Sequence, residues 1–318
     1  LSIRRQRQMC IRDRNYTNIP YEKKLFQSSS KTYVKNFIDL EKKRNSDIIE
    51  IHNRPSYINF FKNLKNRKFV FYFHNDPLSM NGSIKIKDRV NLLNFCDKII
   101  FNSEWTKNRF FDDISKFYYN CEKVEVIYQS TNKARVDLKN KEKIIAFVGK
   151  LNKSKGYDLF GKSAVKILNE FKDWKVIVYG DEPREKISFR HKRFINLGYQ
   201  SNDKVLDLFK KSSIAVSCSR WEEPFGRSSL EASSRGCATI ISNRGGLPET
   251  ITDGIILNKL NTKELYLAIK NLIKNKKRIK EIQKNSLKNF YLDNKFISAK
   301  IDLYRSNFRV KNIKKRVN

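Results

Sequence analysis

Short apolar runs alternate with longer amphipathic stretches along the first half of the chain. The apolar runs are typical of buried strands, and the stretches between them have the spacing of helices. The predicted strands are residues 47–52, 69–74, 98–102 and 124–128, and the predicted helices are residues 85–96 and 103–111. Ser103 and Glu104 predict the start of the second helix, because a hydroxyl caps free N–H groups and an acid favours the positive end of the helix dipole.

The same rhythm restarts after a polar segment, residues 131–141, which we interpret as an interdomain linker. The predicted strands here are residues 144–148, 175–179, 194–197, 214–217, 239–242 and 255–257. The predicted helices are a stretch ending at Phe171, residues 203–211 and 228–235, and a helical pattern from residue 262 to about 308. Alternation of strands and helices at this spacing predicts an α/β protein whose parallel sheets carry helices on both faces.

Two such series in 318 residues predict two Rossmann-like, doubly wound domains. The first series has only about four strands where a complete domain of this kind has about six. We therefore expect the first domain to be incomplete and the chain to be truncated at its N-terminus. The predicted units are residues 15–138, residues 139–290, and a C-terminal helix over residues 291–318 that crosses back to the first domain.

Residues 1–14 differ from the rest of the chain, because they are rich in Arg whereas the remainder prefers Lys. We expect this segment to be a non-native leader and exclude it from the fold. The alternative is a basic arm that binds nucleic acid or lipid.

The charge is strongly positive, with 67 Lys and Arg against 33 Asp and Glu, and a formal net charge of +34. Such a chain is attracted to polyanions, including anionic membranes. The alternative is that the lysines, which are spread along the chain, only solvate its surface. No apolar run reaches the roughly 20 residues of a membrane span. The five cysteines form no CxxC pair, so we expect a cytoplasmic protein, with attachment to the inner face of the membrane left open.

Residues 219–251 (SRWEEPFGRSSLEASSRGCATIISNRGGLPETI) hold the most informative pattern. A loop with proline and glycine follows a predicted strand, and a helix begins near Arg227. The free N–H groups of that helix start form an anion site suited to a diphosphate, to which Ser228 can add a hydroxyl. Glu223 and Glu231 flank the start, so one carboxylate can bind a ribose and the other a hexose. An ordinary surface helix with an acidic start has the same spacing.

A second segment suited to phosphate is FVGKLNKSKG, residues 147–156. Gly149 ends a predicted strand and lets a ligand approach the backbone. Lys150, Lys153 and Lys155 follow at the carboxyl end of that strand, where ligands bind in open α/β sheets. The alternative is a solvated lysine loop.

Together, the two segments resemble the C-terminal donor domain of family 4 glycosyltransferases (glycosyl transferases group 1), which have the GT-B fold. The matching residues of the first segment are Gly149, Lys150, Lys155 and Gly156. Those of the second are residues 223–226 (EPFG), residues 230–232 (LEA) and residues 245–249 (GGLPE). Residues 178–181 (VYGD) also match, and the resemblance extends over roughly residues 47–304.

The resemblance implies two GT-B domains facing a cleft, with the donor site in the second domain. Lys150 and Lys155 would bind the diphosphate, together with the backbone of Arg227 and Ser228. Glu231 would hold the ribose. The transferred sugar would be held by Glu223, the backbone of Phe225 and Gly226, and, across the cleft, by His74 at a strand end of the first domain. Tyr199, within residues 198–200, would lie near the base.

The chain departs from the family pattern at three places. Lys150 replaces an arginine and loses its bidentate fork, which puts donor preference in doubt. Residues 128–131 (YQST) replace an Asn-Gly segment at the hinge, and an N-terminal glycine-rich loop is missing.

The resemblance implies hexosyl transfer with retention, by front-face attack assisted by the leaving diphosphate. No convincing Asp-x-Asp motif occurs, so we expect no cofactor and no obligatory metal. We expect a UDP-, GDP- or ADP-sugar as donor and a cell-envelope glycan or lipid-linked acceptor, as in polysaccharide or lipopolysaccharide biosynthesis. The alternatives are a nucleotide-sugar epimerase of the same fold, which should lack the paired glutamates, and a basic nucleic-acid-binding protein. The second would need a basic face with interleaved aromatic residues, which the sequence does not display, so no nucleic acid is expected as a partner.

Overall fold

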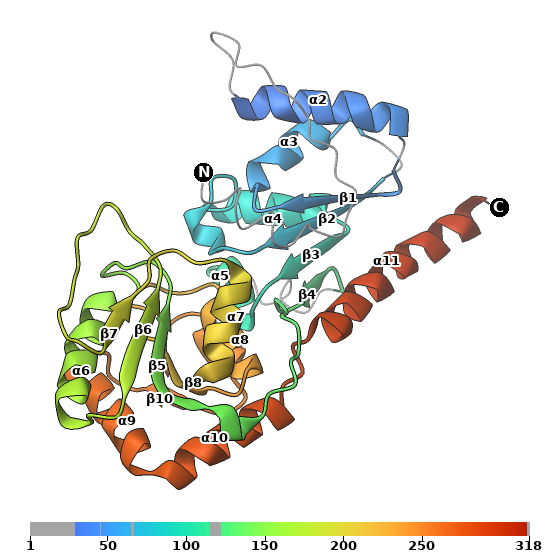
Figure 1. Cartoon of the computed structure of the whole chain (residues 1–318). Coiled ribbons are helices and arrows are strands. Elements are labelled where there is room, and N and C mark those ends of the chain that lie inside the picture. Colours follow the sequence, from blue (N-terminus) through green and yellow to red (C-terminus); the bar gives the residue numbers. More distant parts are fainter. Residues whose placement is uncertain (1–28, 45, 65–66, 115–121, 317–318) are drawn as a thin grey trace.

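The chain folds into two parallel β-sheets flanked by helices, followed by a long C-terminal helix that runs beside the first sheet (Figure 1). This computed structural model describes residues 29–44, 46–64, 67–114 and 122–316. The predicted leader, residues 1–14, lies outside the described residues. No helix within these ranges is both long and apolar enough to cross a membrane.

The first sheet has the strand order β1-β2-β3-β4, and all its described strands are parallel. Its strands are β1 (Ile48–His52), β2 (Lys68–Phe73), β3 (Lys98–Phe101) and β4 (Val124–Val126). Its helices are α2 (Ser29–Arg44), η1 (Pro55–Tyr57), α3 (Ile58–Phe61), η2 (Pro77–Ser79), α4 (Ile86–Phe95) and α5 (Glu104–Phe110). Each strand is added on the same side of the preceding one, and crossovers between parallel strands are right-handed. The connecting helices therefore share one face of the sheet.

Alternate residues of the central strands separate the two faces of this sheet. Phe71 and Phe73 point into a buried cluster that includes Leu92 of α4 and Phe110 of α5. Tyr72, between them, belongs to a different cluster on the other face. There it packs with residues of α11 (Asn294–Arg316) and of the second half of the chain. The C-terminal helix therefore covers the face that the connecting helices leave open.

The second sheet has the order β10-β9-β8-β5-β6-β7 and is also parallel. Its strands are β5 (Glu142–Val148), β6 (Lys175–Tyr179), β7 (Phe194–Asn196), β8 (Ser212–Ser217), β9 (Ala238–Ser242) and β10 (Ile255–Leu257). From β5 the chain proceeds toward β7, and from β8 it proceeds toward β10. The order thus reverses between β5 and β8, and ligands of open α/β sheets bind at the carboxyl ends of strands beside such a reversal.

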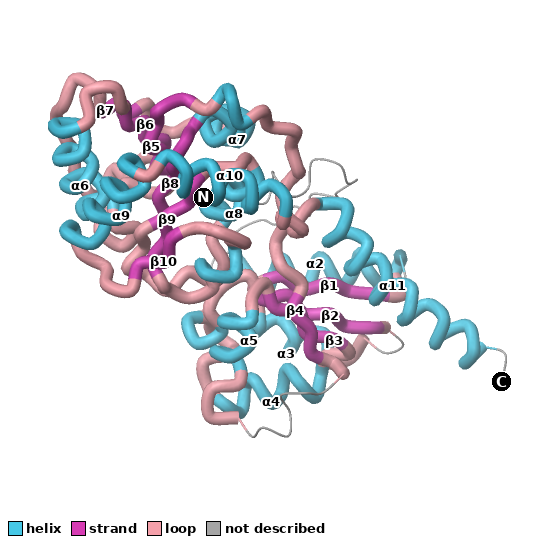
Figure 2. The backbone as a smooth tube through the Cα atoms, turned by 90° about the horizontal axis from the view of Figure 1, so that it is seen from below, coloured by secondary structure: helices cyan, strands magenta, loops and turns pink. Residues whose placement is uncertain are grey.

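Helices cover both faces of the second sheet (Figure 2). They are α6 (Tyr157–Glu170), α7 (Asn202–Lys211), α8 (Arg227–Ser234), α9 (Thr262–Lys274) and α10 (Lys276–Lys288). Helix α6 buries Tyr157, Phe160, Ala164 and Ile167, whose spacing places them on one side of the helix, against Phe147 of β5. Leu208 and Phe209 of α7 pack with Ala146 on the opposite face.

The predicted strands are confirmed, and Ser103 caps α5 by accepting the N–H of Thr106 at 2.9 Å. Helices α2 and α3 were not predicted. The helical pattern from residue 262 consists of three helices, broken at Asn275 and at residues 289–293. Within residues 131–141, the predicted linker, a short 3-10 helix, η4 (Leu138–Asn140), is present, and Thr131 forms a β-bridge with Asp293.

Candidate functional site

A small pocket lies at the reversal point of the second sheet, between the ends of β5 and β8 and the start of α8. Its volume is about 70 Å³. The predicted site residues that line it are Gly149, Lys155, Glu223, Gly226, Arg227 and Ser228. Two segments separated by some 70 residues of sequence therefore meet at one place, as expected for the carboxyl edge of a parallel sheet.

Glycines allow the loops around this pocket to touch. A Cβ atom on Gly180 would lie 1.8 Å from the carbonyl oxygen of Gly149, so the ends of β5 and β6 approach only because this side chain is absent. Gly156, in the left-handed conformation with φ of 71°, directly precedes α6 as its N-cap, and a Cβ atom there would lie 1.9 Å from the carbonyl oxygen of Cys218. The loop after β5 is thereby packed directly on the loop after β8.

The start of α8 is left-handed at Gly226, with φ of 115°, and no side chain caps it there. A Cβ on Gly226 would lie 2.5 Å from Cδ2 of Leu247. The first N–H groups of α8 and the positive end of its dipole therefore face the pocket, which gives this position the character of an anion site.

Two cation–carboxylate pairs join the predicted residues. The ammonium of Lys155 pairs with the carboxylate of Glu223, which is largely buried. Arg227 donates to Oε1 of Glu231 at 2.9 Å, and the amide of Asn202 donates to the same oxygen at 3.2 Å. Only 5% of Glu231 is exposed, so its orientation is fixed by these two donors.

In the first domain, His74 directly follows β2 and contacts a second histidine. Nδ1 of His52 lies 2.9 Å from Nε2 of His74, so one of these nitrogens carries the shared proton. The backbone of His74 is also held, since its N–H donates to Asn53 Oδ1 at 2.8 Å and its carbonyl accepts from Asn102 Nδ2 at 3.1 Å. The ring of His52 stacks on Tyr72 at 4.4 Å.

Five predicted residues do not line the pocket: His74 and Glu231, described above, and Lys150, Tyr199 and Phe225. The side chains of Lys150 and Tyr199 are exposed. Phe225 is buried between the two sheets, where its ring stacks on Tyr128 at 5.7 Å. Its side chain therefore anchors the 223–226 loop to the interdomain core, and only its backbone can face a ligand.

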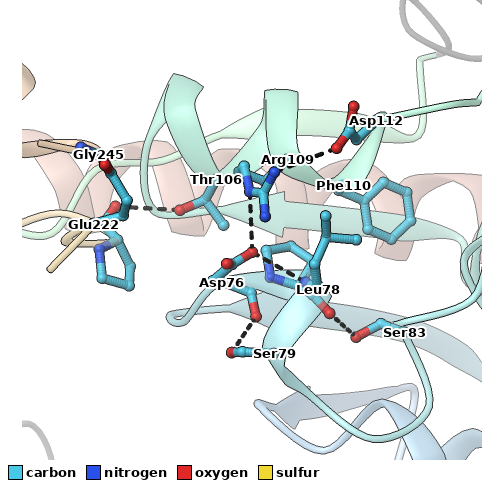
Figure 3. Close-up of polar contacts among 12 residues, drawn as sticks. Asp76, Leu78, Ser79, Ser83, Thr106, Arg109, Phe110, Asp112, Glu222 and Gly245 are labelled. Atoms are coloured by element: carbon cyan, nitrogen blue, oxygen red, sulfur yellow. Dashed lines mark hydrogen bonds and ion pairs between the residues drawn. The ribbon is translucent and has the colours of Figure 1, made fainter.

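Several residues of the site were missed by the sequence-based interpretation. Glu222, next to Glu223, lies beside Gly245 (Figure 3) and accepts its N–H at 2.5 Å. Glu222 also accepts an N–H of the Arg244 guanidinium at 2.9 Å. His52 carried a usable signal, because it ends its predicted strand as His74 does, and neighbouring parallel strands end at one edge. Asn202 carried no signal beyond its place before a predicted helix.

The loop after β2 is held against α5 by charged groups. Figure 3 shows Arg109 of α5 between Asp76 and Asp112, with distances of 3.5 Å and 3.3 Å. Asp76 also accepts the N–H of Leu78 at 3.0 Å, which caps η2. Across the described ranges, no group of three or more His, Cys, Asp or Glu side chains is arranged to hold a metal ion.

Comparison with known proteins yields a family and a fold. The putative glycosyltransferase YtcC of Bacillus subtilis (strain 168) is 24% identical over 247 residues, which cover 68% of this chain and 60% of that protein. The spore coat protein SA of the same organism is 26% identical over 281 residues, covering 77% of this chain and 74% of that protein. This chain thus matches three-fifths of the length of the former and about three-quarters of the latter.

The crystal structure of Anabaena Alr3699/HepE in complex with UDP and glucose matches 86% of this chain and 81% of its own, with a TM-score of 0.68 and 16% identity. This likeness shows that the two facing α/β domains have the GT-B fold. The family model described as glycosyl transferases group 1 matches residues 129–289, about half of the chain, including all of the pocket. By this match, the chain belongs to the glycosyl transferases group 1 family.

Proposed function

We propose that the protein is a retaining glycosyltransferase that moves a hexose from a nucleoside-diphosphate sugar to a glycan or lipid-linked acceptor of the cell envelope. The observation that carries this proposal is the meeting of Lys155 and Glu223 beside the uncapped start of α8. A cation, a carboxylate and free N–H groups in one pocket match the charges and hydroxyls of a sugar diphosphate. HepE, which binds UDP and glucose, supports a donor of this class.

The roles follow the geometry of the pocket. Lys155, assisted by the exposed Lys150, and the backbone N–H groups of Arg227 and Ser228 would bind the diphosphate. Glu231 would accept hydrogen bonds from the ribose. Because Lys155 is already paired with Glu223, an arriving diphosphate has to draw the lysine away, and this frees the carboxylate for the hydroxyls of the transferred sugar.

Two further residues would contact the ends of the donor. Tyr199, more than half exposed in the loop after β7, would lie near the base. His74 would reach the transferred sugar from the first domain, and its contact with His52 would fix which ring nitrogen donates. Neither residue lines the small pocket, so both roles require the donor to extend beyond it.

The chemistry we propose is front-face displacement with retention. The oxygen of the acceptor hydroxyl attacks the anomeric carbon while the bond to the diphosphate breaks, and the departing diphosphate takes the proton of that hydroxyl. The protein's contribution is then orientation of both substrates and stabilisation of the charge that develops on the diphosphate. Lys155 and the start of α8 supply that stabilisation, so we expect no obligatory metal.

The acceptor proposal rests on charge. A net charge of +34 favours an anionic surface, and each basic residue near such a membrane contributes about 1 kcal/mol of attraction. We therefore propose that the protein works at the cytoplasmic face of the membrane. The similarity to a protein named for the spore coat is in keeping with an envelope glycan as product.

Calorimetry on the wild type tests the donor site. UDP, GDP, ADP and the corresponding sugar nucleotides are titrated into the protein, into Glu231→Ala, and into Glu281→Ala as the control. Like Glu231, Glu281 pairs with an arginine on its own helix, at a distance of 3.1 Å. It is exposed and lies on α10, away from the pocket. We expect saturable binding of one nucleotide series, lost in Glu231→Ala and kept in Glu281→Ala.

Two results would overturn the proposal: the absence of nucleotide binding, or salt-dependent DNA binding that exceeds nucleotide binding. The stereochemistry is tested separately with the nucleotide sugar that binds, by following the anomeric proton of the product by NMR. An inverted product would exclude the retaining mechanism while leaving the transferase assignment in place.

A further inference from the structure

Glu249 of the second domain caps a helix of the first domain. It lies in η5 (Leu247–Thr250), in the turn after β9. Its two carboxylate oxygens accept the N–H groups of Glu104, at 2.7 Å, and of Trp105, at 2.9 Å, the first two residues of α5. Thr106, the third residue, donates its N–H to Ser103. One acceptor from the first domain and two from the second thus satisfy the first turn of α5.

A second contact joins the same helix to the loop that carries Glu223, residues 223–226, here called the donor loop. The hydroxyl of Ser103 donates to the carbonyl oxygen of Pro224 at 2.6 Å, and that of Thr106 lies 3.2 Å from the same oxygen. Both hydroxyl-bearing residues are fully buried. Figure 3 shows Thr106 aimed at this carbonyl, close to Glu222 and Gly245.

The turn that carries Glu249 also supports the donor loop directly. The N–H of Gly246 donates to the carbonyl oxygen of Glu223 at 2.6 Å. Any Cβ on Gly245 would lie 2.2 Å from that same oxygen, so turn and loop are in van der Waals contact. A displacement of the turn therefore displaces the backbone of Glu223.

The two hydrogen bonds from α5 reach Glu249 in partly buried surroundings. Burial raises the pKa of its carboxyl, and the N–H groups of Trp105 and Glu104 and the hydroxyl of Tyr128 oppose that rise. Tyr128 in turn stacks on Phe225 of the donor loop. Hydrogen bonds from a helix N-terminus to a partly buried carboxylate are charge-assisted, which makes them stronger than neutral ones.

We infer that Glu249 is a positioning residue of the transfer reaction: it fixes the turn at residues 245–249 to α5 and so sets the place of Glu223 relative to the first domain. This inference rests on the proposed function, since it concerns how the transferred sugar is held. The nucleotide, whose ribose Glu231 would hold while Asn202 restrains this carboxylate, does not depend on the contact of Glu249 with α5. Loss of Glu249 should therefore affect turnover and leave nucleotide affinity intact.

The experiment compares Glu249→Ala and Glu249→Gln with the wild type in the full chain. The glutamine keeps one acceptor oxygen for α5, whereas the alanine keeps none. The control is Asp137→Ala, which removes a carboxylate that accepts a backbone N–H at 2.9 Å in η4, away from the pocket. Amide hydrogen exchange is measured for peptides that cover residues 102–110 and 223–230, UDP affinity by calorimetry, and kcat with the donor identified for the wild type.

We expect Glu249→Ala to speed exchange in both peptides and to lower kcat on the order of 10²-fold, since small misplacements of positioned groups cost this much. UDP affinity should stay within about twofold, and Glu249→Gln should fall between the wild type and the alanine variant. Unchanged exchange in residues 223–230, or parallel losses of UDP affinity and kcat, would overturn the inference. If the wild type transfers no sugar, the proposed function fails, and the exchange of residues 223–230 still decides whether Glu249 holds the donor loop.

Discussion

The side chain of Lys155, at the end of the loop after β5, forms an ion pair with that of Glu223, in the loop after β8. The two groups we assign to the diphosphate and to the transferred sugar therefore neutralise each other in the protein without substrate. Binding of the donor has to exchange one partner for another at both residues. This exchange avoids leaving a carboxylate or an ammonium unpaired in a partly buried site.

Glu223→Gln should separate nucleotide binding from transfer. Without the competing carboxylate, Lys155 is available to the diphosphate at once, so we expect UDP affinity to rise about two- to fivefold. Transfer should fall sharply, because the transferred sugar loses its carboxylate. Calorimetry with UDP and an assay of kcat measure the two effects. Lys155→Met is the reference, with weaker UDP binding expected, and weaker binding by Glu223→Gln would contradict the role of Lys155.

Asn202→Ala should weaken UDP binding and leave inorganic pyrophosphate binding unchanged. The amide of Asn202 and the guanidinium of Arg227 both donate to Oε1 of Glu231, and removal of the amide releases one of the two restraints on this carboxylate. Loss of one hydrogen bond to a charged group corresponds to about a tenfold loss of affinity. Competition binding measures the affinities of the variant for UDP and for pyrophosphate. Equal losses for the two ligands would show that Glu231 acts on the diphosphate and not on the ribose.

The strands and the location of the site were predictable because each depends on local pattern. The buried strands are continuous apolar runs, and ligands of such sheets bind at their carboxyl ends. The pairing of Lys155 with Glu223 was not predictable, since it depends on the contact of Gly156 with Cys218. The spacing of apolar and polar residues within each segment does not show that these two loops touch.

Contacts between the two domains could not be predicted from the sequence either. Glu249 belongs to a motif that was recognised, but its partner in the structure is the first turn of α5, 145 residues earlier in the chain. The motif identifies Glu249, but it does not show which groups Glu249 contacts. Helix α2 escaped prediction for a different reason, because its many polar residues obscure the apolar stripe that includes the buried Val34.

Gly156→Ala should lower the free energy of unfolding by about 3 kcal/mol, the sum of a left-handed backbone and a steric overlap. The overlap is with backbone, at the carbonyl oxygen of Cys218, so no side chain can move aside to relieve it. Gly198→Ala is the matched control, because Gly198 has a similar φ of 64° and no atom lies within 4 Å of the place that its methyl group would take. That variant should lose only about 1 kcal/mol. Urea unfolding of both variants measures the difference. Equal losses of unfolding free energy would show that the backbone at Cys218 shifts to accommodate the methyl group without destabilising the fold.

The contact between α11 and β1 should depend on pH through Glu50. Arg305 donates two hydrogen bonds to this carboxylate, at 2.8 Å and 2.7 Å, and Tyr304 donates a third. Burial alone would raise the pKa of Glu50, but the hydrogen bonds from Arg305 and Tyr304 outweigh it, with a smaller contribution from His52, and lower that pKa. Because the folded state binds this proton less tightly than the unfolded state, the stabilisation is complete above the unfolded pKa of about 4.3 and is lost as the pH falls through the folded value.

Arg305→Met removes two of these hydrogen bonds and should lower the free energy of unfolding by about 1 kcal/mol at pH 7, where solvent screens part of the interaction. The loss should shrink as the pH falls below about 4, since protonated Glu50 no longer attracts the guanidinium in the wild type either. Urea unfolding at a series of pH values measures it. In a protein that already carries Glu50→Gln, Arg305→Met should lower the free energy of unfolding by less, and this loss should not depend on pH. A loss that is the same at pH 7 and at pH 3 would mean that Arg305 stabilises α11 by packing on Tyr304, whose ring lies 6.0 Å from the guanidinium carbon, and not through the charge of Glu50.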